Sequence, residues 1–170
     1  GEIDVFANDQ DGKGVADVEC RLLIDNMPFV IEKTNESGKC KLYAPYGKYE
    51  LKVLYKGFLL IDKSIRSGFL KRNEKLELNL YPLKLVVRDK LGFSPGVKLN
   101  VALTSKEMEE ATNIIPEEER DGVFLFQNLL PRNYTLRISY GDIIKEEKIR
   151  IPVEGNEIKN HFSCNVSFKT

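Results

Sequence analysis

Apolar residues recur at every second position in many short runs of the chain, and two of these runs are near copies of each other. Gly38–Gly57 is GKCKLYAPYGKYELKVLYKG, and Gly122–Gly141 is GVFLFQNLLPRNYTLRISYG. In each copy an alternating run is followed by a turn that contains proline, and then by a second alternating run that begins with tyrosine. A period of two is typical of a half-buried strand. We therefore expect each copy to be a β-hairpin.

The remaining alternating runs repeat one plan around these two copies. In the first half they are Ile3–Ala7, Val18–Leu22, Phe29–Ile31, Phe58–Ile65 and Leu76–Leu80, and in the second half Leu83–Val87, Val97–Val101, Ile143–Ile151 and Ile158–Phe168. A length of 170 residues suggests one domain, but an internal repeat outweighs that prior. The pattern predicts an all-β protein with two related β-domains in tandem, residues 1–81 and 82–170.

Two segments depart from the repeat. Only Tyr81-Pro82 separates the halves, and so short a connector with a fixed proline φ predicts a semi-rigid rod. Thr104–Asp121 is an insertion in the second half, and we expect it to be a contact loop, because long inserts in compact domains are often functional. Within it, Ser105–Glu110 has the capping pattern of one helical turn, and the acidic residues 117–121 indicate a solvated loop.

The repeated motifs resemble those of the carboxypeptidase regulatory-like domain, a transthyretin-like and Ig-like β-sandwich. They are the D-x-x-G turns at Asp9 and Asp89, the Thr34-to-Gly38 motif, and the Y-x-L-x-V/I strands that begin at Tyr49 and Tyr134. This resemblance implies a Greek-key sandwich of about seven strands per repeat. It also implies a domain without catalysis of its own, which accompanies other domains in extracellular or periplasmic proteins.

A related group, the collagen-adhesin B-type domains, can carry a Lys–Asn isopeptide bond promoted by a buried acid. In this sequence the lysine position of that motif is Ala7 or Val87, and the acid position is Val53 or Ile138. All four residues are apolar, so we expect no isopeptide bond.

Charge and hydropathy exclude several partners. The formal net charge is zero, which removes the basic surface expected of a nucleic-acid or anionic-membrane binder. No apolar run has the length of a membrane span, so we expect membrane association only through an anchor outside this segment. The chain lacks an initiating methionine, which suggests a mature form or an excised fragment.

Catalytic and metal motifs are present only in fragments. Gly92–Gly96 matches G-x-S-x-G, with Asp142 and His161 downstream, but a nucleophile elbow needs a helix after Ser94, and the alternation there predicts a strand. His161 is the only histidine, and no CxxC pair occurs, so we expect no zinc site. Asn8–Gly12 resembles the opening of a calcium loop without its later ligands, and turn chemistry explains it. We therefore expect no catalytic residue, cofactor or metal.

The cysteines leave two alternatives open. Cys20 and Cys40 fall on inward positions, so they are either two buried thiols, which we favour, or a disulfide between neighbouring strands. Cys164 is inward in the other half and expected to be unpaired.

Surface features favour an extracellular or cell-surface protein. Three N-glycosylation sequons begin at Asn35, Asn133 and Asn165, at positions that we expect to be exposed. Our leading hypothesis is a non-catalytic spacer and interaction module that binds a protein partner or neighbouring domains of its own polypeptide. One alternative is a carbohydrate-binding module that uses exposed tyrosines at 43, 46 and 55, and another is an accessory domain that regulates a catalytic partner.

Overall fold

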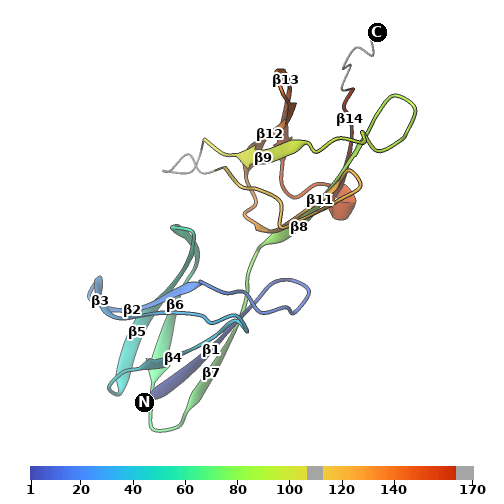
Figure 1. Ribbon diagram of the computed structural model, residues 1–170. Helices are drawn as coiled ribbons and strands as arrows, with labels where there is room; N and C mark the ends of the chain where they lie inside the picture. Colours follow the sequence, from blue (N-terminus) through green and yellow to red (C-terminus); the bar gives the residue numbers. More distant parts are fainter. Residues whose placement is uncertain (107–112, 164–170) are drawn as a thin grey trace. The chain divides into compact units, whose positions relative to one another are not determined.

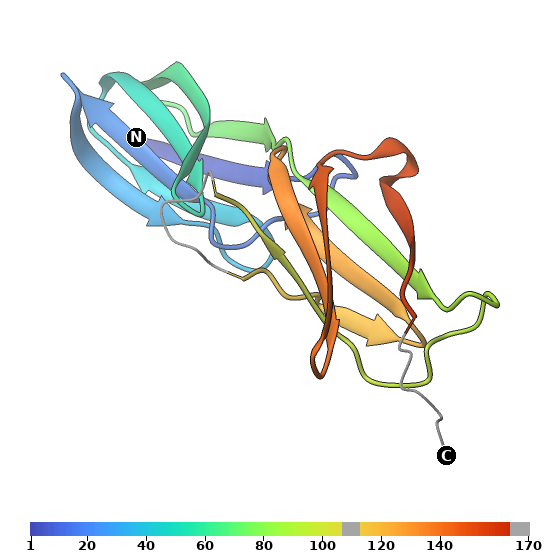
Figure 2. The same ribbon diagram turned by 90° about the horizontal axis from the view of Figure 1, so that it is seen from above.

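The computed structural model describes residues 1–106 and 113–163, and the chain divides into two compact units, Gly1–Asn79 and Leu80–Thr170. Figures 1 and 2 show the two units in colours that run from blue to green and from green to red. This division lies two residues before the boundary expected from the sequence. Each unit is described by itself below.

The first unit contains two packed sheets. One sheet has the strand order β4-β1-β7, and the other has the order β3-β2-β5-β6 (Figure 1). Its strands are β1 (Glu2–Asn8), β2 (Glu19–Ile24), β3 (Met27–Lys33), β4 (Lys39–Tyr43), β5 (Gly47–Tyr55), β6 (Phe58–Ser67) and β7 (Arg72–Glu77).

The second unit has the sheet orders β10-β11-β8-β14 and β13-β12-β9, which repeat those of the first unit except that its third strand, β10, joins the other sheet. Its strands are β8 (Tyr81–Arg88), β9 (Asn100–Thr104), β10 (Glu118–Arg120), β11 (Val123–Leu129), β12 (Asn133–Tyr140), β13 (Ile143–Arg150) and β14 (Glu157–His161). A single 3₁₀ turn, η1 (Glu154–Asn156), precedes β14. The expected fold class, two β-sandwiches of about seven strands each, is confirmed.

The first and last strands of each unit lie side by side and run in the same direction. β1 pairs with β7 from Ile3 opposite Arg72 to Asn8 opposite Glu77. β8 pairs with β14 from Lys84 opposite Glu157 to Arg88 opposite His161. All other named strand pairs in the described ranges are antiparallel.

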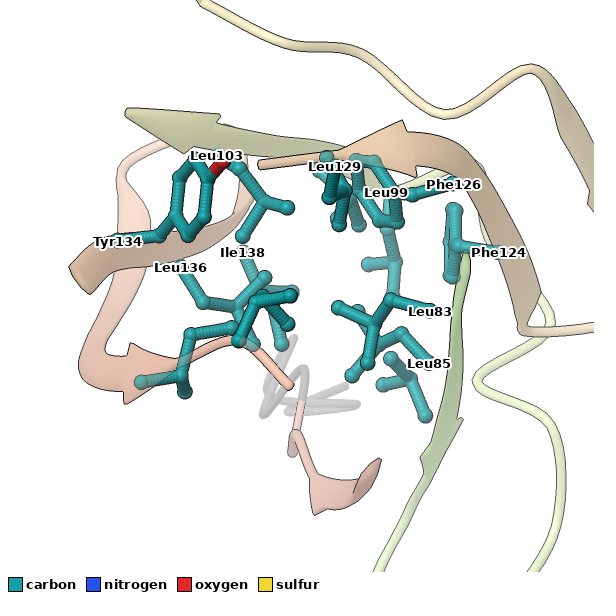
Figure 3. Packing of buried hydrophobic residues seen from close by; sticks show 14 of the residues in the cluster. Leu83, Leu85, Leu99, Leu103, Phe124, Phe126, Leu129, Tyr134, Leu136 and Ile138 are labelled. Atoms are coloured by element: carbon teal, nitrogen blue, oxygen red, sulfur yellow. The ribbon is translucent and has the colours of Figure 1, made fainter. Parts of the chain in front are cut away.

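The alternating residues fill the space between the sheets of each unit. Fully or nearly fully buried side chains of the first unit come from both of its sheets, for example Ile3, Val5, Leu22, Leu42, Leu51 and Val53. Figure 3 shows the equivalent layer of the second unit, where Leu83, Leu85, Phe124 and Phe126 face Leu103, Leu136 and Ile138. Removing such side chains from water is the main source of stability for a sandwich.

The expected hairpins are wrong. β4 pairs with β1, whereas β5 pairs with β2 and β6, so the two strands of the first copy belong to different sheets. β11 and β12 are divided in the same way. A period of two shows that a strand is half-buried, but it does not show which strand is its hydrogen-bonding neighbour. The proline-bearing turn therefore crosses from one sheet to the other instead of closing a hairpin.

The insertion also differs from the expectation. Glu118–Arg120, expected to be part of a solvated acidic loop, forms the short edge strand β10, which pairs with β11. Ile114 makes an isolated bridge with Leu103. The helical turn expected at 105–110 lies mostly outside the described residues. Residues 164–168 of the last expected strand also lie outside them.

Candidate functional site

The two D-x-x-G turns form the same hydrogen bonds. The Oδ1 atom of Asp9 accepts the backbone N–H groups of Asp11 and Lys13, both at 2.9 Å. The Oδ1 atom of Asp89 accepts those of Leu91 and Phe93, at 2.9 and 3.0 Å. A short acidic side chain that bonds its own backbone two and four residues on is the usual device of such turns. In Asn8–Gly12, the segment that resembles the opening of a calcium loop, the first carboxylate is therefore bonded within the turn.

The two copied tyrosines also make equivalent bonds, each back to a carbonyl four residues earlier. The hydroxyl of Tyr49 donates to the carbonyl of Pro45 at 2.7 Å, and that of Tyr134 donates to the carbonyl of Leu130 at 2.9 Å. These bonds pin the crossing from β4 to β5 and from β11 to β12. The structural role expected for both tyrosines, a tyrosine corner, is confirmed.

A polar cluster closes one edge of the second sandwich. The Nζ of Lys145 on β13 donates to the Oδ1 of Asn160 on β14 at 2.6 Å and to the carbonyl of His161 at 2.8 Å. The Nδ2 of Asn160 donates to a carboxylate oxygen of Glu147. Asn160 is buried, whereas Glu147 is exposed. β13 and β14 are edge strands of different sheets, so this cluster links the two sheets.

The corresponding edge of the first sandwich is closed by an ion-pair cluster. Glu74 on β7 is buried and pairs with Lys63 on β6 at 2.6 Å and with Arg72 on its own strand. Burial acts to raise the pKa of Glu74, but the hydrogen bonds and charges of Lys63 and Arg72 prevail and lower it below its ordinary value. Both edge clusters were missed from the sequence, because charged residues on an alternating strand are typical of a solvated face.

The hydrolase-like residues occupy unrelated surface positions. Ser94 is exposed in the loop between β8 and β9, and this loop runs on to Leu99 before β9 begins. Asp142 is exposed in the turn between β12 and β13, and His161 is exposed at the end of β14. The strand expected over Val97–Val101 begins only at Asn100, but the next element after Ser94 is still a strand and not the helix that a nucleophile elbow needs.

Cys20 and Cys40 meet inside the first sandwich. Cys20 on β2 is fully buried and Cys40 on β4 is half-buried, and both are free thiols. The two thiols lie close enough for each to shift the pKa of the other. The structure thus places the two residues side by side in the reduced form. Cys164 lies outside the described residues.

Two of the three sequon asparagines fall in described segments. Asn35 is exposed in the turn between β3 and β4, where its Oδ1 accepts the backbone N–H groups of Ser37 and Lys39 at 2.9 and 3.1 Å. Asn133 is exposed at the start of β12. Glycosylation at both positions stays a prediction. Asn165 lies outside the described part of the chain.

Exposed apolar side chains gather on the first unit. Met27, Phe29 and Ile31 on the edge strand β3 are all at least 48% exposed. Phe29 and Tyr43 line a shallow hollow together with Gly1, Ala44 and Pro45. Tyr43 and Tyr46 are 62% and 65% exposed, as expected, but Tyr55 is only 7% exposed. The expectation of an exposed Tyr55 is wrong, because its side chain falls on the inward positions of β5 with Tyr49, Leu51 and Val53.

Within residues 1–106 and 113–163, no group of three or more His, Cys, Asp or Glu side chains is placed to hold a metal ion. No helix in the same residues is long and apolar enough to cross a membrane.

Fold and contacts together define the class of the protein: a tandem of two β-sandwiches whose repeated polar contacts serve the fold itself. No family model matches the chain, and no curated protein does. The carboxypeptidase regulatory-like resemblance therefore stays an interpretation of the motifs.

Several solved structures have a similar arrangement of strands. One is the TIE protein of Bacillus anthracis, at 20% identity and a TM-score of 0.41, covering 95% of this chain and 33% of that one. Another is a streptococcal ancillary pilin, at 12% identity and a TM-score of 0.45, covering 96% and 62%. A third is the shaft pilin SpaA of Lactobacillus rhamnosus GG, at 9% identity and a TM-score of 0.48, covering 94% of each chain.

The chain spans less than two thirds of the length of the first two of these proteins. With TM-scores below 0.5, the three similarities carry no argument about function.

Proposed function

We propose that the chain is a non-catalytic spacer and interaction module of an extracellular or cell-surface protein. The observation that carries this proposal is the parallel pairing of the first and last strands in each unit. Because β1 and β7 run in the same direction, the chain enters the unit at one end of the sandwich and leaves it at the other. β8 and β14 give the second unit the same property.

This arrangement makes every unit add length to the polypeptide. A strand of six or seven residues advances roughly 20 Å at about 3.3 Å per residue. An antiparallel pair of terminal strands would return the chain to the end at which it entered. Three residues, 78–80, join β7 to β8, and so short a connector leaves little slack between successive units.

The distribution of polar groups supports a role without catalysis. The buried or partly buried polar side chains described above bond to backbone groups or to each other across the sandwich, as Tyr49, Glu74 and Asn160 do. A hydrolase would need a nucleophile, a base and an orienting group in contact. Ser94, Asp142 and His161 lie in separate loops and strand ends.

The interaction surface that we propose is the edge of the first unit formed by β3 and the adjoining hollow at Phe29 and Tyr43. An edge strand presents unpaired backbone groups, and exposed apolar side chains on it favour contact with another polypeptide. The partner is a protein or a neighbouring domain of the same polypeptide.

The spacer role is tested by single-molecule energy transfer between dyes attached at the two termini. We expect one narrow distribution of end-to-end distances. The control variant carries a flexible Gly-Ser insertion after Asn79, and it should broaden that distribution. A distribution that is already broad without the insertion would contradict the spacer role.

The non-catalytic assignment has its own test. Any hydrolase activity of the chain that is lost in Ser94→Ala would contradict it.

A second candidate, a carbohydrate-binding module, is favoured by the exposed aromatic rings at Tyr43 and Tyr46 beside the hollow. Sugar rings stack on such faces because both surfaces are apolar in part. Glycan-array binding that is lost in Tyr46→Ala and kept in Tyr140→Phe, a change in the other unit, would support it. An absence of binding to every glycan on the array would count against it.

A further inference from the structure

The first unit holds two thiols at a place where a covalent bond would join its two sheets. Cys20 lies on β2, between β3 and β5, where it is opposite Glu32 and Val53. Cys40 lies on β4, the edge strand of the other sheet, opposite Val5. Both residues fall on the inward positions of their strands, in the two facing sheets, and the two thiols lie close enough for each to shift the pKa of the other.

The two thiols differ in their surroundings. Cys20 is fully buried, whereas Cys40 is half-buried near the side of the sandwich where β3 and β4 lie next to each other. The hydrogen bond with Cys40, and then burial, raise the pKa of the Cys20 thiol. The same hydrogen bond lowers the pKa of Cys40, and this effect prevails over burial and the carboxylates of Glu32 and Asp4, which raise it. Cys40 is the more accessible of the two thiols, so it is the one that an oxidant in solution reaches first.

We propose that Cys20 and Cys40 form an intramolecular disulfide that ties the two sheets of the first unit together when the chain meets an oxidising disulfide. The oxidant is a small-molecule disulfide such as oxidised glutathione, or the disulfide of a thiol oxidoreductase. The reduced thiol pair and the disulfide are two forms of the same site.

The chemistry follows ordinary thiol–disulfide exchange. The Sγ thiolate of Cys40 attacks one sulfur of the oxidant, its S–S bond breaks, and one thiolate of the oxidant leaves and takes up a proton. The thiol of Cys20 then loses its proton and attacks the Sγ of Cys40, and the second thiolate of the oxidant leaves. Two cysteine thiols are oxidised and one disulfide of the oxidant is reduced to two thiols, so electrons and protons balance.

The bond would close a loop that contains the whole of β3. This loop, residues 21–39, includes the exposed apolar side chains of Phe29 and Ile31.

The disulfide and the proposed spacer role are independent of each other, because the disulfide rests on the thiol pair and the spacer role rests on strand direction.

The test uses the full chain with the substitution Cys164→Ser, which leaves only these two thiols. After incubation with oxidised glutathione, free thiols are alkylated in denaturant and the digested protein is mapped by mass spectrometry. We expect a peptide pair joined through Cys20 and Cys40 that disappears on reduction, with no disulfide between chains. Both thiols alkylated, a stable mixed disulfide on Cys40, or chains joined to each other through Cys40 would each overturn the proposal.

The second measurement is calorimetry. The variant that also carries Cys40→Ser is compared with its Cys164→Ser parent, each before and after incubation with oxidised glutathione. In the parent, oxidation should raise the unfolding midpoint of the first unit by roughly 10–20 °C, because a loop of this length is constrained in the unfolded chain. In Cys40→Ser the midpoint should not depend on the oxidant. An equal rise in the variant, or no rise in the parent, would contradict the disulfide.

Discussion

At the scale of single residues, equivalent positions of the two units perform the same task. Asp9 and Asp89 close the same turn, and Tyr49 and Tyr134 fix the same crossing between sheets. These residues carry the family-like motifs in the sequence. Their contacts show that the motifs encode backbone geometry. The presence of these motifs in a sequence therefore indicates turns and not a catalytic site.

The tyrosine hydroxyls should stabilise their units measurably. Tyr134→Phe keeps the buried ring and removes only the bond to the Leu130 carbonyl, so we expect a loss of about 1 kcal/mol in the free energy of unfolding. Tyr49→Phe should lose a similar amount. Tyr43→Phe is the matched control, because its hydroxyl bonds to Glu2 on the exposed surface. Urea denaturation measures all three, and equal losses in the control would contradict this account.

The Glu74 cluster should make the stability of the first unit depend on pH. The folded pKa of Glu74 lies below its ordinary value of 4.5, so the unfolded chain binds the proton more tightly. Its contribution is therefore present above pH 4.5 and is lost as the pH falls through the lower, folded pKa. Calorimetric midpoints of the wild type and Glu74→Gln should converge on acidification. A difference between them that stays constant from neutral pH downwards would contradict the prediction.

At the scale of elements, the sequence predicts the strands well and their partners poorly. The alternation of Ile3–Ala7 or Tyr49–Val53 reports one buried face, which is a local property. Pairing depends on where a turn sends the chain, and the Pro45 turn sends β5 into the other sheet. The sequence does not predict β10, because its three residues are all charged and show no alternation of apolar and polar positions.

The polar contacts also divide into local ones, which the sequence predicts, and long-range ones, which it does not. The turn roles of Asp9, Tyr49 and Tyr134 could be predicted, because they depend on residues close in the chain. The contact between Lys145 and Asn160 could not, since it joins edge strands of two sheets.

The turn before β4 comes so close to β1 at Gly38 that this position should tolerate only glycine. Gly38 has a φ of +79°, and a Cβ atom there would lie 2.4 Å from the carbonyl oxygen of Ala7. Gly57 has a similar φ of +83° with nothing within 4 Å, so it is a matched control. We expect Gly57→Ala to cost about 1 kcal/mol of stability, and Gly38→Ala to cost clearly more, on the order of 3 kcal/mol. Chemical denaturation compares them, and equal costs would show that the close contact has no effect.

The Lys145–Asn160 contact should remain a set of hydrogen bonds. Attack of an amine on an amide is favoured where the groups are sealed from water, but the Glu147 side chain beside them is exposed. The four positions expected to lack isopeptide chemistry, Ala7, Val53, Val87 and Ile138, are buried and apolar. The intact mass of the purified chain should equal that of its sequence after allowance for disulfides. A mass lower by one ammonia, restored in Asn160→Ala, would contradict this prediction.

At the scale of the whole molecule, duplication is the organising fact. Each unit fills its own space between two sheets, and each closes one edge with a polar cluster between its last two strands. The clusters use different residues, an ion pair in one unit and an amide in the other. What the duplication keeps is therefore the direction of the strands and the turns with the Asp and Tyr side chains that fix them, rather than the chemistry of the edge clusters.

The parallel terminal strands have a mechanical consequence. Tension applied to the two ends of the first unit pulls β1 and β7 past each other, so the hydrogen bonds between them share the load and must fail together. Pulling instead between Gly1 and Tyr43, at the same end of the antiparallel β1–β4 pair, would break bonds one after another. We expect a higher rupture force in the first geometry than in the second when both are measured by single-molecule stretching, and equal forces would contradict it. A polypeptide built in this way would withstand drag from flowing liquid while it holds whatever is attached beyond it.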